Sequence, residues 1–251
     1  MRLLLKLKTK GSFKYDLSYY HKAQGFIYNL LKDTDYGILH DKKDYKYFCF
    51  SNIFPIGDIK DNETRNFLIS SPDRVFIKIL FDKLSDLSNK KNSINIGEME
   101  FFIDSIDVVN IKLKKKFNLI TATPIIIRIP ENKYEIYNIP HNFRKKRYVY
   151  WRPEYQVKAF VNQLEENLIN KYRKFYQKNI KKERIIQGLK FNKSVSSRVV
   201  IEGKERIFIG SIWEFWFEYL NPKIKKIIEF GIECGLGERN SFGFGFVNPV
   251  Y

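Results

Sequence analysis

The order in which strand-like and helix-like patterns follow one another constrains this chain more than any other feature. The first stretch alternates, with Leu3, Leu5 and Leu7 on one face and Lys6 and Lys8 on the other, as in a half-buried strand. The next segments have, in turn, helical, strand, strand, helical and strand spacing: residues 18–33, 46–54, 66–70, 71–87 and 94–109. The first half of the chain therefore has the order β-α-β-β-α-β.

The second half repeats this order and ends on a short strand. Before that strand come segments of strand, helical, strand, strand and helical spacing: residues 118–129, 155–176, 185–201, 206–219 and 222–234. The order is that of the ferredoxin-like (RRM-like) unit. We therefore expect an α+β fold of two tandem ferredoxin-like units, an N-terminal domain at 1–113 and a C-terminal domain at 114–251 with a glycine-rich loop.

Capping residues indicate where three of the helices begin. Asp16 or Ser18 is available to cap the first helix. Ser71 precedes the second helix and places Pro72 in its first turn, and Pro222 opens the last helix.

The charge balance points to a polyanionic partner. The 251 residues contain 45 Lys and Arg against 28 Asp and Glu, a net charge of +17. Such an excess favours nucleic acid, because each neutralised phosphate releases condensed counterions. A lysine-rich proteome would give the same balance, but basic residues also cluster, at 112–116, 143–152, 178–184 and 222–226.

Composition also bears on the compartment and on cofactors. No apolar run approaches the roughly 18 to 20 residues of a membrane helix, and the charged first residues lack the apolar core of a signal peptide. With two cysteines, Cys49 and Cys234, we expect a cytoplasmic protein without a disulfide framework or a membrane partner. Three scattered histidines predict no metal site, we expect no cofactor, and Glu165 and Glu166 are expected on a solvated helix face.

The stretch GLGERNSFGFGFV, residues 235–247, is the most unusual in the chain. It follows a helix and precedes a strand, the reverse of nucleotide-binding loops, so an ATP or NAD site is disfavoured. One interpretation is structural, with Gly235 or Gly237 ending the helix and Gly243 and Gly245 close-packed. The other is contact with RNA or phosphate through an anion-binding nest, with Arg239 as a donor.

The basic connector FRKKRYVYWR, residues 143–152, mixes cations with aromatic rings. The mixture is typical of single-stranded RNA binding, with phosphates on the cations and bases stacked on Tyr148, Tyr150 and Trp151. Alternatively, the aromatic side chains turn into the core. We expect at least partial RNA contact, through Arg144, Lys145, Lys146 and Arg147.

Two stretches resemble a known family. GLGERNSFGFGFV is similar to the C-terminal signature of CRISPR-associated endoribonucleases that process precursor CRISPR RNA, in the repeat-associated mysterious protein superfamily. AQGFIYNLLKDTDYGILHDKKDYKYFCFS, residues 23–51, resembles the family's N-terminal helix, catalytic loop and aromatic strand. The matching positions are Gln24, Gly25, Tyr28, Leu39, His40, Lys46, Phe48, Phe50 and Ser51. The element order also matches the family's tandem ferredoxin-like fold.

The resemblance implies metal-independent cleavage within a CRISPR repeat. The 2′-hydroxyl attacks the adjacent phosphate and leaves 2′,3′-cyclic phosphate and 5′-hydroxyl ends. The implied catalytic residues are His40, Tyr28 and Lys46, with Lys42 and Lys43 close to the last. The partner is CRISPR repeat RNA, and a CRISPR effector complex and a homodimer are further candidates. The expected RNA-binding residues of the loop are Gly235, Gly237, Arg239, Asn240, Ser241, Gly243 and Gly245.

The chemistry of these side chains agrees with such a reaction. Histidine has an ordinary pKa near 6.5 and suits proton transfer, which makes His40 the main acid–base candidate. Lysine stabilises developing negative charge, whereas tyrosine is a poor base, so Tyr28 is expected to orient the hydroxyl or the histidine. Three alternatives remain: a non-cleaving RNA-binding subunit of a CRISPR ribonucleoprotein, a general single-strand binder, and, least favoured, a nucleotide-dependent enzyme.

Overall fold

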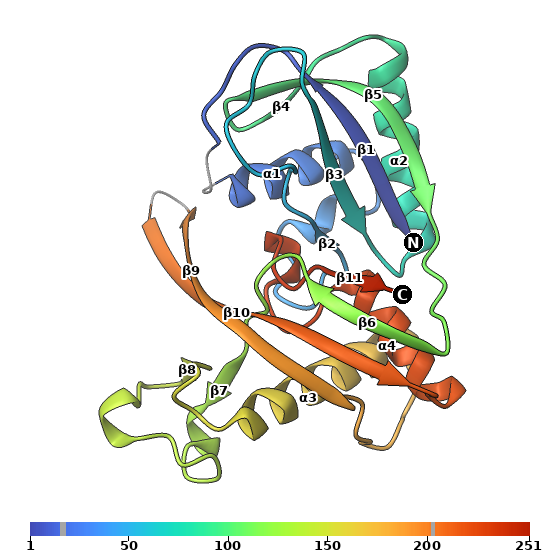
Figure 1. Cartoon of the computed structure of the whole chain (residues 1–251). Coiled ribbons are helices and arrows are strands. Elements are labelled where there is room, and N and C mark those ends of the chain that lie inside the picture. The colour runs from blue at the N-terminus through green and yellow to red at the C-terminus, as the bar shows by residue number, and fades with distance from the viewer. Residues whose placement is uncertain (16–18, 202–203) are drawn as a thin grey trace.

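The computed structural model describes residues 1–15, 19–201 and 204–251 and forms two main sheets, each with two helices on one face (Figure 1). The first sheet has the order β2-β3-β1-β5-β4, and its neighbouring strands are antiparallel. Its strands are β1 (Arg2–Thr9), β2 (Cys49–Phe50), β3 (Thr64–Ser70), β4 (Ile94–Ile96) and β5 (Met99–Val109), and its helices are α1 (Tyr20–Leu31) and α2 (Arg74–Asn89).

The second sheet is also antiparallel and has the order β11-β6-β10-β9. Its strands are β6 (Lys116–Thr121), β9 (Gly188–Ile201), β10 (Lys204–Glu218) and β11 (Val247–Val250), and its helices are α3 (Val157–Tyr176) and α4 (Pro222–Cys234). A separate hairpin of β7 (Arg128–Pro130) and β8 (Tyr148–Tyr150) lies between β6 and α3 in sequence. The β-α-β-β-α-β order thus occurs twice, which confirms the predicted fold class. The boundary near residue 113 stays a prediction.

Each sheet buries its apolar face against its own helices. Leu3, Leu5 and Leu7 of β1 are completely buried, as their alternation predicts, and Ile27 of α1 packs in the same cluster. The second cluster contains Trp213, Phe215 and Phe217 of β10 together with apolar residues of α3 and α4. This layering leaves the ends of α1 and α3 and the glycine-rich stretch near the junction of the two halves (Figure 1).

Helix starts differ in part from expectation. Asp16 and Ser18 lie outside the described residues. For α2 the predicted cap, Ser71, is wrong: the side chain of Asp73 accepts hydrogen bonds from the amides of Val75 and Phe76. Ser71 is buried, and its hydroxyl donates to the carbonyl of Tyr47 and accepts from the amide of Asp73, so it holds the turn before the helix.

Two further expectations change. The strand predicted at 118–129 ends at Thr121, and past Pro124 the chain makes only isolated bridges before β7. Glu165 is buried rather than solvated, because its carboxylate accepts hydrogen bonds from the amides of Ile185 and Ile186 at 2.7 and 2.8 Å.

The free thiols of Cys49 and Cys234 are both buried. None of the helices described is long and apolar enough to cross a membrane.

Candidate active site

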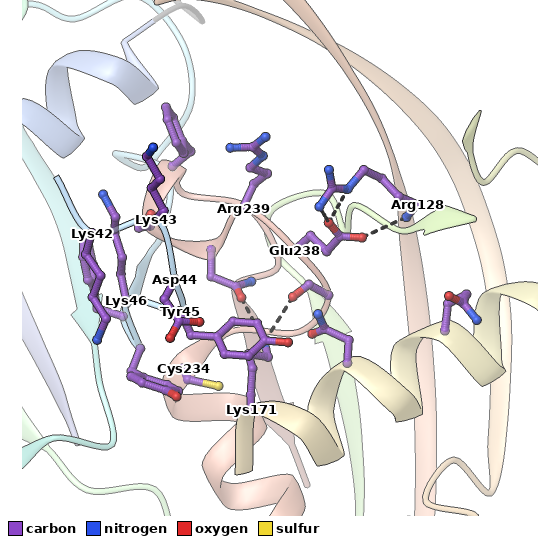
Figure 2. Close-up of a pocket in the computed structure, with 18 of the residues that line it drawn as sticks. Lys42, Lys43, Asp44, Tyr45, Lys46, Arg128, Lys171, Cys234, Glu238 and Arg239 are labelled. Carbon is purple, nitrogen blue, oxygen red and sulfur yellow. Dashed lines mark hydrogen bonds and ion pairs between the residues drawn. The ribbon is translucent and has the colours of Figure 1, made fainter. Parts of the chain in front are cut away.

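A cleft of about 880 Å³ lies at the junction of the two halves (Figure 2). Its walls are the loop of residues 40–48, the β7–β8 hairpin, the C-terminal part of α3 and the glycine-rich loop, residues 235–247. Figure 2 shows lysines of the first loop on one side, Arg239 at the top and Arg128 on the far side. The cleft therefore presents positive charge from elements far apart in the sequence.

The three predicted catalytic residues lie together: His40 and Lys46 line the cleft, and Tyr28 contacts Lys46. The Lys46 ammonium donates to the hydroxyl of Tyr28 at 2.8 Å and to the backbone carbonyl of His40 at 3.0 Å. The rings of Tyr28 and His40 meet edge to face, with centroids 5.5 Å apart. An ammonium has three hydrogens, so these bonds leave one hydrogen of Lys46 for a ligand. Among the three lysines considered, Lys46 is the one that contacts both other residues.

The His40 ring is accessible to a substrate. It follows a short 3₁₀ turn (Gly37–Leu39), and 71% of its side chain is exposed. Its Nδ1 lies 2.7 Å from a carboxylate oxygen of Asp41. A hydrogen bond at Nδ1 orients the ring and leaves Nε2 as the nitrogen that can exchange a proton with RNA.

Burial shapes the protonation of the other two residues. It raises the pKa of Tyr28 to about 12, and hydrogen bonds with Ser241 and Gln24 act in the opposite direction. Desolvation by burial also lowers the pKa of the Lys46 ammonium, opposed by the nearby Asp41 carboxylate. The raised pKa keeps the Tyr28 hydroxyl protonated at neutral pH, which disfavours a role as a base.

The glycines of the C-terminal loop serve close packing. A Cβ on Gly245 would lie 1.9 Å from the carbonyl oxygen of Leu236, and one on Gly243 would lie 2.5 Å from the Phe50 ring. Gly235 ends α4 in a positive-φ conformation, as the structural interpretation predicts. The amides of Gly243 and Gly245 donate to carbonyls within the protein, so they are not free to form an anion-binding nest. Direct RNA contact by the glycines stays a prediction.

A buried lysine holds this loop in shape. The Lys171 ammonium of α3 donates to the carbonyls of Gly235 and Gly237 at 2.6 and 3.1 Å and to Oδ1 of Asn240 at 2.9 Å. The Asn240 amide in turn donates to the carbonyls of Leu236 and Phe244. Sequence analysis did not single out Lys171. The sequence did contain a signal for it: Lys171 lies three residues after Leu168, on the buried face of α3. A lysine at a buried position needs hydrogen-bond partners.

The polar side chains of the loop differ in what they contact. Asn240 is engaged within the loop, whereas the Arg239 side chain is exposed, with its guanidinium 5.8 Å from the centroid of the Phe208 ring. Glu238 forms an ion pair with Arg128 of β7, which ties the loop to the hairpin. Ser241 points toward α1, where its hydroxyl accepts from the Gln24 amide at 3.3 Å.

The side chains of the basic connector also differ, since some are buried and others reach the cleft or solvent. Trp151 is 3% exposed, and its ring packs against Phe160 and Trp213, so the expected base stacking by Trp151 is wrong. Arg144 forms an ion pair with Glu135 and supports the connector itself. The side chains that reach the cleft or solvent are those of Arg147, Tyr148, Lys145 and Lys146. Within the described chain, no group of three or more His, Cys, Asp or Glu side chains could hold a metal ion.

Comparison with known proteins identifies the family. A family model described as "CRISPR associated protein Cas6, C-terminal" matches residues 106–249. The chain is also 32% identical to CRISPR-associated endoribonuclease Cas6 2 of Methanocaldococcus jannaschii, over the whole of both chains. This chain belongs to the Cas6 family. It is further 27% identical to a Cas6 endoribonuclease of Haloferax mediterranei, across all of this chain and 94% of that protein.

Solved structures share the fold of this Cas6 chain. A structure named "CRISPR associated protein Cas6" superposes with a TM-score of 0.71 at 24% identity, over 100% of this chain and 99% of the other. Another, named "An RAMP protein binding different RNA substrates", gives a TM-score of 0.75 at 21% identity over the whole of both chains. The full coverage confirms that both halves take the Cas6 architecture.

Proposed function

We propose that this cleft is the active site of an endoribonuclease that cleaves precursor CRISPR RNA within the repeat. The enzyme class follows from membership of the Cas6 family, whose curated relatives are named CRISPR-associated endoribonucleases. The observation that carries the site assignment is the contact of Lys46 with both Tyr28 and the His40 backbone, beside an exposed imidazole. Repeat RNA is the partner of the cleft. A homodimer and transfer of the product to an effector complex are further proposals.

The reaction is an attack of the 2′-hydroxyl on the neighbouring phosphorus. The 2′-oxygen–phosphorus bond forms, the bond to the 5′-oxygen breaks, and 2′,3′-cyclic phosphate and 5′-hydroxyl ends result. One proton leaves the 2′-oxygen and one reaches the departing 5′-oxygen, and His40 Nε2 is placed to carry out such a transfer. The remaining hydrogen of Lys46 can contact a non-bridging phosphate oxygen, where negative charge increases in the transition state.

The RNA chain is expected to follow the positive charge around this centre. Arg239 lies on the glycine-rich loop, and Arg147 and Tyr148 lie on the hairpin across the cleft. Exposed Lys145 and Lys146 extend the same charge beyond Arg147. Arginines and lysines contact phosphates, while the partly exposed Tyr148 ring offers a surface for a base. Gly235, Gly237, Gly243 and Gly245 would then shape the wall that presents Arg239.

The proposal is tested by replacing the imidazole. His40→Ala should lower the single-turnover cleavage rate of repeat RNA by about 10²- to 10⁴-fold, the usual contribution of a general acid–base group. RNA affinity should change only a few fold, because the phosphate-binding cations remain. Gel electrophoresis of end-labelled RNA gives the rate, and end mapping identifies the cyclic phosphate.

Two controls accompany this experiment. His141→Ala removes an exposed histidine outside the proposed catalytic group and should cleave at the wild-type rate. Cleavage should also persist in EDTA. An unimpaired His40→Ala protein, or activity that requires added metal, would refute the mechanism. Tight binding without cleavage by the wild-type protein would instead identify an RNA-binding subunit.

A further inference from the structure

We propose that Gln24 and Ser241 are positioning residues: through them the glycine-rich loop of the C-terminal half holds Tyr28, and with it the Lys46 ammonium, in place for cleavage. The inference rests on the function proposed for the cleft. It assigns these two side chains an effect on the rate of cleavage rather than on the capture of RNA.

Gln24 has a buried amide with two partners. It lies on α1 one turn before Tyr28, so both side chains project from the same face of the helix. Gln24 is 5% exposed, and its amide nitrogen lies 3.2 Å from the Tyr28 hydroxyl and 3.3 Å from the Ser241 hydroxyl. An amide nitrogen carries two hydrogens, so each partner can accept one of them. The glutamine bridges the proposed catalytic tyrosine and the loop.

The Tyr28 hydroxyl accepts two hydrogen bonds from the protein. A phenol oxygen accepts through two lone pairs. Lys46 and Gln24 donate to this oxygen at 2.8 and 3.2 Å. Both lone pairs of Tyr28 are used within the protein. Tyr28 therefore serves as the support that directs the Lys46 ammonium toward the cleft.

Ser241 is the point at which the second half of the chain reaches this support. It is separated from Gln24 by 217 residues in the sequence. Its neighbour Asn240 is held by the Lys171 ammonium, so Ser241 extends from an anchored loop. Arg239, two residues before Ser241, is exposed at the cleft. RNA bound at Arg239 would thus act on the same short segment that holds Tyr28.

Two substitutions remove this link with little change in volume. Gln24→Met keeps a side chain of similar length but removes both donors, and Ser241→Ala removes the hydroxyl. Each should lower the single-turnover cleavage rate at saturating protein by about tenfold to a hundredfold, because a small displacement of a catalytic group has effects of that size. The dissociation constant for repeat RNA should change by less than about threefold, because no phosphate-binding cation is lost.

Three further variants make the test specific. Ser241→Thr keeps the hydroxyl and should restore most of the rate. Gln187→Met removes an exposed glutamine outside the cleft, whose amide donates to the carbonyl of Glu218 at 3.0 Å, and should cleave as wild type. The double variant Gln24→Met with Ser241→Ala should be no slower than the slower single variant, because both changes break one link.

The outcomes separate this inference from the proposed function. If the wild-type protein cleaves repeat RNA and both single variants cleave at its rate, the positioning role is wrong and the proposed function stands. If the variants lose affinity or thermal stability while the rate at saturation is unchanged, the link is merely structural and the inference is overturned. Multiplicative losses in the double variant would also overturn it. If the wild-type protein never cleaves, the proposed function itself fails.

Discussion

Tyr28 is a partly buried residue whose proposed role needs no exchange of a proton. Its hydroxyl lies among Lys46, Gln24 and Ser241, and burial raises the pKa of Tyr28 to about 12. A phenol with that pKa is neutral over the whole physiological range. In the proposed mechanism the tyrosine contributes through geometry, by accepting the hydrogen bond of the Lys46 ammonium.

The raised pKa of Tyr28 gives a prediction for alkaline solution. In the unfolded chain a tyrosine ionises near pH 10, whereas Tyr28 in the folded protein ionises near pH 12. Between about pH 10 and 12 the folded state therefore keeps the Tyr28 proton that the unfolded state has lost. The stability that this residue contributes is fully present below about pH 10 and is lost as the pH rises through about 12. The phenolate absorbance of wild type minus Tyr28→Phe should show one group with a midpoint near 12. A midpoint below 10 would contradict the burial of this hydroxyl.

At the scale of elements, the glycine-rich loop acts as a packed connection between α4 and β11. The amide of Leu236 donates to the carbonyl of Gly245 at 2.8 Å, so the two ends of the loop touch. Lys171 and Asn240 then satisfy the carbonyls that this compact turn directs inward. The glycines allow the backbone to approach itself, and Ser241 provides a polar contact with α1.

Two glycine substitutions should have opposite effects on stability. Gly245→Ala places a Cβ 1.9 Å from the Leu236 carbonyl at a φ of +74° and should lower the free energy of unfolding by more than about 2 kcal/mol. Gly25→Ala lies within α1 with no atom within 4 Å of the new Cβ and should raise it by about 0.5 to 1 kcal/mol. Denaturant unfolding of both variants measures the difference. Equal stabilities would show that the loop is not close-packed.

Across the whole molecule, Arg2 is one of the residues that connect the two halves. Arg2 on β1 is 3% exposed and donates to the carbonyls of Ile232 and Val247 and to Asn248, which belong to α4 and β11. Its guanidinium also lies 4.2 Å from the centroid of the Phe246 ring. The cleft lies at the junction of the same two halves, so this connection bears on the active site.

Removal of the arginine should weaken the junction. Arg2→Met leaves two buried carbonyls without their donor and should lower the free energy of unfolding by about 2 to 6 kcal/mol, since each unsatisfied group costs about 1 to 3. Arg184→Met removes an exposed arginine and should change it by less than about 0.5 kcal/mol. Thermal and urea unfolding provide the measurement. Similar midpoints for wild type and Arg2→Met would show that the halves dock without this residue.

Local patterns were sufficient for most elements of the fold, although they missed the β7–β8 hairpin. The alternation in β1, the helical spacing of α1 to α4 and the repeated element order predicted two ferredoxin-like units, and the observed element order agrees. Short motifs around His40 and the terminal glycines marked the stretches that meet at the cleft. These features could be predicted because they depend on residues close together in the chain, where spacing alone decides which face a side chain takes.

The tertiary structure alone decided which of these side chains work together. Trp151, which was expected to contact RNA, lies in the core. Lys171, which was not among the candidate residues, anchors the glycine-rich loop. The contact between Gln24 and Ser241 forms only when the two halves dock. Burial and hydrogen-bond partners of this kind depend on how distant segments pack, and a polar side chain enters the interior only where distant groups satisfy it.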